Sequence, residues 1–115
     1  MYLFEQADEL LAGIRLSNDH LVDLLVVQER ALLSTFWGTT LLLVGHGEAA
    51  APHLITSAEQ ALRMGRIAAL AGNSDMAARA EVIEAYALSR LGYVDLAAAR
   101  VNAVAHRARP PHRAG

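Results

Sequence analysis

The sequence predicts an all-α fold, in which a long N-terminal helix packs on two or three shorter helices as a helical bundle. Three observations support this. The chain of 115 residues contains 23 Ala and 18 Leu, both strong helix formers, and only 3 Pro. Apolar residues recur with helical periodicity over the first forty residues. At 12.3 kDa the chain supports one domain, expected over residues 1–109, with a disordered basic tail at 110–115.

The first segment carries a seven-residue apolar pattern with alternating steps of three and four. Its members are Phe4, Ala7, Leu11, Ile14, Asn18, Leu21, Leu25, Gln28, Leu32 and Thr35. Such spacing indicates a helix that buries one face against other helices. The phase continues through Gly13 and Ser17-Asn18, which favours one helix from about Tyr2 to Leu43. The alternative is a break, with Ser17 or Asn18 capping a second helix.

Residues 45–56 contain two Gly and one Pro and are predicted to form a loop. Ser57 followed by Gln60 matches a capping box, so a helix is expected from Ser57 to Ala71, with Gly72 as its left-handed stop.

The segment 73–75 (Asn-Ser-Asp) should cap the next helix, which runs to about Leu91 and stops at Gly92. A last helix is predicted from about Val94 to Ala108, ended by Pro110-Pro111. Its expected buried stripe consists of Val94, Ala97, Ala98, Val101, Val104 and Ala105.

The length of the first helix predicts a homodimer. At 1.5 Å per residue it would extend about 63 Å, whereas each later helix would extend only about 20–26 Å. A second copy is the simplest cover for the excess apolar stripe, with Asn18 and Gln28 as register-setting polar pairs. The predicted interface residues are Phe4, Leu11, Ile14, Asn18, Leu21, Leu25, Gln28, Leu32, Phe36 and Trp37. A break at Ser17-Asn18 would make a monomeric bundle feasible.

Charge is distributed unevenly along the chain. Residues 1–60 carry a net charge of −6 and residues 61–115 carry +4, and all ten basic residues are Arg. The basic end could contact phosphate, an acidic partner or the chain's own acidic half. The residues that would do so are Arg100, Arg107, Arg109 and Arg113. With no secretory signal and no sufficiently apolar span, a cytoplasmic protein without membrane contact is expected.

No motif compels a particular chemistry. Cysteine is absent, and the five His show no zinc-binding spacing, so neither a metal nor a cofactor is expected. Phe36-Trp37 is interpreted as a core or interface anchor rather than a ligand platform. The segment 72–78 echoes 92–98 in its Gly, Asp and Ala placement, as in tetratricopeptide-type helical repeats, but the spacing of 20 residues is shorter than theirs.

Two further family resemblances concern function. Arg100-Val-Asn-Ala-Val-Ala-His106 resembles the Arg/His motif of the HEPN group of small all-α domains, and Arg15 to His20 has similar spacing. The resemblance implies a dimer in which Arg holds phosphate and His transfers a proton during RNA cleavage. Residues 10–33 resemble the first helix of the all-helical chorismate mutases, although Leu11 and Gln28 stand where that family has substrate-binding Arg.

The favoured function is a small non-enzymatic, self-associating helical interaction or adaptor protein, with a second copy or another protein as partner. One alternative is an HEPN-like ribonuclease or nucleotide-binding protein that uses Arg100 and His106, with nucleic acid as partner. The other is a helical bundle that binds a small molecule between its helices.

Overall fold

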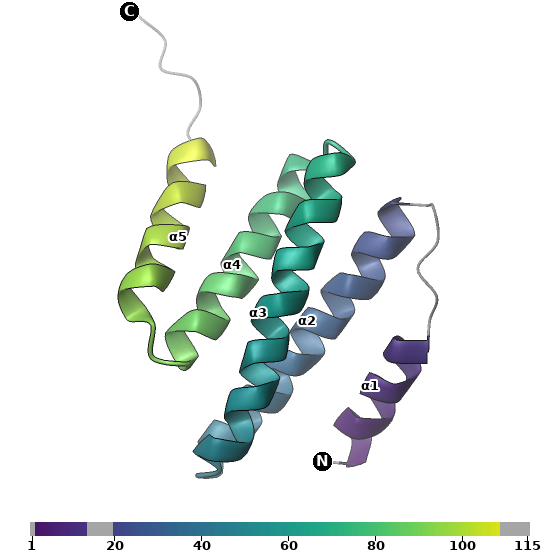
Figure 1. The fold of residues 1–115 in the computed structure, drawn as a ribbon, viewed down its shortest axis with the longest axis vertical. Coiled ribbons are helices and arrows are strands. Elements are labelled where there is room, and N and C mark those ends of the chain that lie inside the picture. The colour runs from purple at the N-terminus through teal and green to yellow at the C-terminus, as the bar shows by residue number, and fades with distance from the viewer. Residues whose placement is uncertain (1, 14–19, 109–115) are drawn as a thin grey trace, which may run out of the picture.

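The computed structural model describes residues 2–13 and 20–108, which fold into five α-helices without any strand (Figure 1). This confirms the all-α fold class and is consistent with a helical bundle. The helices are α1 (Tyr2–Gly13), α2 (His20–Leu43), α3 (Gly47–Leu70), α4 (Ser74–Arg90) and α5 (Val94–Ala108).

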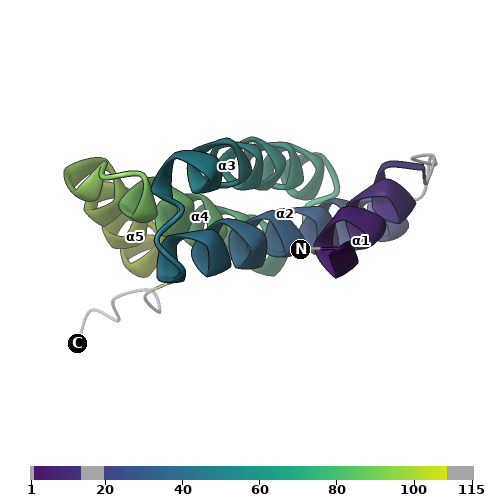
Figure 2. The same cartoon turned by 90° about the horizontal axis from the view of Figure 1, so that it is seen from below.

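The helices form a thin slab of two layers. In Figure 2, α3 lies above α2 and α4, while α1 flanks α2 at one side of the slab and α5 lies at the other. The helix pairs in contact are α1 with α2, α2 with α3, α2 with α4, α3 with α4, and α4 with α5. The core is therefore built by α2, α3 and α4, and α1 and α5 are each attached through a single neighbour.

The prediction of one helix from Tyr2 to Leu43 is wrong. Helix α1 ends at Gly13, α2 begins at His20, and the two lie side by side (Figure 1). The rings of Phe4 and Trp37 stack with centroids 6.0 Å apart, whereas an uninterrupted helix would separate these residues by about 50 Å. Two separate helices can each bury an apolar stripe and keep the same seven-residue spacing across the break between them. The unbroken spacing in the sequence therefore could not distinguish one long helix from two shorter ones. The predicted cap, Ser17 or Asn18, lies outside the described residues.

This correction removes the length argument for a dimer. The leading apolar stripe is folded back on itself, so its length no longer exceeds what one chain can cover. Any case for self-association must come from the surface that the folded chain leaves exposed.

Helix α3 begins ten residues earlier than predicted, and the expected loop at 45–56 is mostly helical. Six of its residues are buried at alternating steps of four and three: Ala50, Leu54, Ser57, Ala61, Met64 and Ala68. Burial of this stripe outweighs Pro52, which is exposed in the second turn and removes one backbone hydrogen bond. Ser57 is therefore a fully buried residue inside the helix rather than its cap.

The predicted stops at Gly72 and Gly92 are confirmed, and a third glycine, Gly45, plays the same part. All three have positive φ, at +83° for Gly45, +69° for Gly72 and +99° for Gly92. At each turn the next residue donates its backbone N–H to the carbonyl five residues earlier, which is a Schellman motif. The predicted cap of α4 is confirmed as well, because the Asn73 side chain accepts a hydrogen bond from the Met76 N–H at 3.1 Å.

We expect Gly72→Ala to lower the free energy of unfolding by about 1–2 kcal/mol, because an L residue is strained in the left-handed conformation. The matched control is Gly47→Ala. Gly47 lies in the first turn of α3 with no atom near its added Cβ and no positive φ, so that change should be neutral or slightly stabilising. Urea unfolding followed by circular dichroism measures both. Equal effects of the two changes would contradict the assigned turn geometry.

Small side chains bring α2 and α3 close together. Gly38 faces Leu54, and a Cβ at Gly38 would lie only 2.8 Å from the Leu54 Cγ and Cδ2 atoms. One turn earlier, the buried hydroxyls of Thr35 and Ser57 are 2.6 Å apart, and Thr35 also donates to the Ala31 carbonyl at 2.8 Å. Apolar clusters lie on both sides of this polar contact. They comprise Leu41, Ala50 and Leu54 at one end, and Leu24, Val27, Met64, Ala68, Met76 and Ala80 at the other.

Helix α5 has the predicted bounds but not the predicted burial. Only Ala97 of the expected stripe is buried and Val104 is half-buried, whereas Val94 and Val101 remain 63% and 47% exposed. The stripe is wider than the single neighbour α4 can cover, so one flank of α5 is apolar and uncovered. The Pro110-Pro111 stop and the predicted tail at 110–115 lie outside the described residues.

Candidate functional site

Exposed apolar side chains gather on the side of α2, α4 and α5 that faces away from α3. On α2, the residues Leu21, Leu25 and Phe36 are 58%, 47% and 60% exposed. They lie in one stripe with Gln28 and Leu32, because steps of three and four residues return to the same helix face. We call the whole surface the outer face. Its residues are Leu21, Leu25, Gln28, Leu32 and Phe36 of α2, Ala78, Val82 and Tyr86 of α4, and Val94, Ala98 and Val101 of α5.

Two open grooves cross the outer face. One, of about 420 Å³, lies between α2 and α4, and the other, of about 490 Å³, lies between α4 and α5. Val82 of α4 lines both grooves and is 50% exposed, so it forms part of the ridge between them. No residue of α3 lines either groove, which places both on the surface opposite the second layer (Figure 2).

Polar contacts hold Tyr86 in place at this ridge. The Tyr86 hydroxyl lies 3.4 Å from the Thr39 hydroxyl of α2, and the Arg90 guanidinium carbon lies 5.1 Å from the ring centroid. The hydrogen bonds to Thr39 and to Arg90 lower the pKa of Tyr86 below its ordinary value. The phenol therefore links α2 to α4 while the residue stays 36% exposed, as in an anchor residue that is ordered before its partner arrives.

The ten predicted interface residues separate into three groups. Leu21, Leu25, Gln28, Leu32 and Phe36 lie on the outer face. Phe4, Leu11 and Trp37 are half-buried, and Phe4 and Trp37 stack on each other where α1 packs on α2. Ile14 and Asn18 lie outside the described residues.

The half of the outer face on α4 and α5 was not predicted from the sequence. Val82 and Tyr86 are four residues apart and share a helix face, but nothing in that spacing tells whether the face is covered. The α5 valines belong to the predicted stripe, but burial was expected for them.

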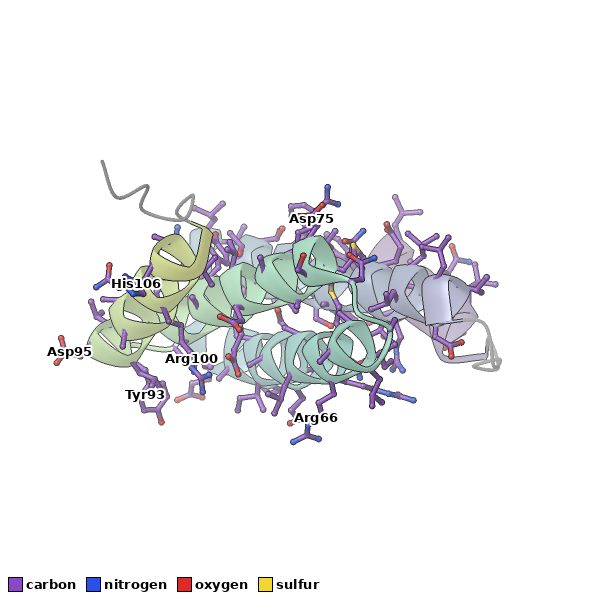
Figure 3. All side chains as sticks on the ribbon, turned by 90° about the horizontal axis from the view of Figure 1, so that it is seen from above. Arg66, Asp75, Tyr93, Asp95, Arg100 and His106 are labelled. Atoms are coloured by element: carbon purple, nitrogen blue, oxygen red, sulfur yellow. The ribbon has the colours of Figure 1, made fainter. Side chains whose placement is uncertain are left out.

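Arg100 and His106 of the HEPN-like motif do not converge. Six residues apart on α5, they project about 120° apart around the helix, and Figure 3 shows them pointing to different sides. The Arg100 Nε lies 3.6 Å from Oε1 of Glu84, whose side chain is only 12% exposed. Arg100 therefore balances a largely buried carboxylate rather than presenting a free cation. The side chain of Arg107, and Arg109 and Arg113, lie outside what the structure describes.

A smaller cleft of about 270 Å³ lies on the opposite surface, between α3, α4 and α5. Small residues line much of it, and Arg66, Glu81, Glu84 and Arg100 are its charged members. Acidic and basic groups balance here, so the cleft favours neither an anion nor a cation.

Neither a metal site nor a membrane-spanning helix occurs in the part of the chain that the structure describes. Across residues 2–13 and 20–108, no group of three or more His, Cys, Asp or Glu side chains is placed to hold a metal ion. Within those same ranges, no helix has the length and apolar character needed to span a bilayer.

The comparisons with known proteins returned no match: no family model, curated protein or solved structure resembles this chain closely enough to be assigned.

Proposed function

We propose that this protein is a small helical interaction module that self-associates through its outer face. The observation that carries the proposal is the size and continuity of the apolar surface over α2, α4 and α5. Seven side chains that are each at least one-third exposed contribute to it: Leu21, Leu25, Phe36, Val82, Tyr86, Val94 and Val101. With the polar side chains at their edges they form a surface that a partner could cover, and each partner in a standard interface buries ~800 Å².

Exposed apolar patches at the upper end of the range found on monomers, with a polar rim, are often interaction sites. The largest apolar patch on a typical monomer is about 300–600 Å². Polar side chains surround the grooves, including Gln28, Arg79, Ser89 and Asn102, as in the polar rim of an interface. The aromatic residues Phe36 and Tyr86 belong to the residue class that anchors such interfaces.

A second copy of the chain is the occupant that we propose. Helix α5 exposes Val94, Ala98 and Val101 beside the groove that it forms with α4, so the apolar groove wall and the apolar ridge at Val82 lie on the same face of one chain. A two-fold axis would place the outer faces of two copies against each other, so that each ridge at Val82 enters a groove of its partner. Each copy would then cover the outer face of the other.

We expect the chain to sediment as a dimer at micromolar concentration and Val82→Glu to sediment as a monomer, because an unpaired carboxylate would be buried at the centre of the contact. Analytical ultracentrifugation measures both. Ile55→Glu is the matched control: Ile55 is 48% exposed, but it lies on α3, away from the outer face. A wild-type mass of 12.3 kDa at every concentration, or equal dissociation by the two variants, would refute the proposal.

A further inference from the structure

Helix α1 lies at the edge of the fold and does not contribute to its buried core. No α1 residue belongs to either buried cluster, and among the described helices the backbone of α1 comes close to that of α2 alone. Its contacting side chains are only half-buried, namely Phe4, Ala7, Asp8 and Leu11. A twelve-residue helix is marginal by itself in water, so α1 depends on the surface that receives it.

The surface that receives α1 is formed by aromatic rings of α2 and α3. The Phe4 ring stacks on Trp37 at 6.0 Å with 12° between the ring planes, and His53 of α3 stacks on the same indole at 3.8 Å and 22°. Burial lowers the pKa of His53, and the Asp8 carboxylate of α1 raises it in opposition. This flank therefore stacks on an aromatic ring of α1, and its His53 imidazole is influenced by the charge of Asp8, four residues later on the same helix.

That pattern is the recognition mode of a helix in a groove. Phe4, Ala7 and Leu11 follow the i, i+3, i+7 spacing by which an amphipathic helix presents its anchors. The Phe4 ring and the Asp8 carboxylate are side-chain groups, and the α1 helix of a second copy carries the same two groups. The contact therefore holds nothing that distinguishes the chain's own α1 from that of a second copy.

We infer that the flank of α2 and α3 around Trp37 and His53 is a helix-binding groove that accepts α1 from a second copy of the chain as well as its own. Exchange of an identical element between copies is a low-cost route to association, because the packing that α1 gives up within its own chain is restored between chains. This contact is separate from the outer face, so the two proposals can fail independently.

Two full-length variants test the exchange, both carrying Val82→Glu to remove the contribution of the outer face. The donor carries Trp37→Ala, so its own groove is impaired and it has no tryptophan. The acceptor carries Phe4→Ala, so its own α1 is weakened while Trp37, the only tryptophan of the chain, reports on the groove. Adding donor to acceptor should shift the tryptophan emission and saturate at one donor per acceptor.

The matched control is a donor that carries Phe4→Ala in addition to Trp37→Ala, which should give no saturable shift. If Trp37→Ala prevents the donor from folding, Trp37→Leu replaces it, because leucine fills part of the indole volume but offers neither a ring on which Phe4 can stack nor indole emission. No shift up to ~1 mM, the effective concentration that a short linker supplies within one chain, would overturn the inference. Shifts of equal size with the donor and with its control would overturn it as well.

Discussion

Leu54→Ala is expected to lower the free energy of unfolding by about 2–5 kcal/mol, the range for leucine removed from a rigid core. Leu54 is 1% exposed and lies in the cluster that joins α2 to α3. The cost should fall toward the upper part of that range, since Gly38 leaves no side chain of its own to fill the cavity. Equilibrium unfolding in urea measures the change.

Gly38→Ala provides the second side of a double-mutant cycle. In the native chain the added Cβ would lie 2.8 Å from two atoms of Leu54, so the change should destabilise. With alanine already at position 54, the clash is gone, and replacing a helical glycine should instead stabilise by up to ~1 kcal/mol. The same sign for Gly38→Ala in both backgrounds would contradict the close approach of the two helices.

Thr35→Val is expected to cost about 1–3 kcal/mol, and more than Ser57→Ala. The Thr35 hydroxyl donates its single proton to the Ala31 carbonyl, so in the 2.6 Å contact Ser57 must be the donor and Thr35 the acceptor. Thr35→Val then leaves a buried Ser57 donor without that acceptor, whereas Ser57→Ala removes the donor and leaves Thr35 bonded to Ala31.

The double variant Thr35→Val/Ser57→Ala tests whether Ser57 is the donor and Thr35 the acceptor in this hydrogen bond. Once both hydroxyls are gone, no polar group of the pair remains buried and unsatisfied, so the double variant should be more stable than Thr35→Val alone. Thermal unfolding of the four proteins gives the coupling energy. Strictly additive effects would show that the two hydroxyls do not act as a pair.

Elements set by local chemistry could be predicted from the sequence. Gly72 and Gly92 stop their helices because a left-handed backbone favours glycine, and Asn73 caps α4 with its own side chain. These effects involve only a few neighbouring residues, so they can be read without knowing the rest of the fold. The apolar stripe of α2 could be identified for the same reason.

Elements decided by competition between local and distant contacts could not be predicted. Ser57 and Gln60 match a helix start, but the buried row from Ala50 to Ala68 extends α3 past that signal. The separation of α1 from α2 left the apolar phase unchanged. The outer face depends on which flank of α5 meets α4, and a stripe from Val94 to Ala105 does not specify how much of its width a neighbour will cover.

The order of packing has a consequence for how quickly the chain reaches its native state. Among the five described helices, each packs on the next one along the chain, and the contact between α2 and α4 is the one that skips a helix. Native pairings are therefore short-range in sequence, which keeps the entropy cost of closing each loop small. Topologies of this kind fold in microseconds to milliseconds, so a newly made chain would expose its unpaired valines and leucines only briefly.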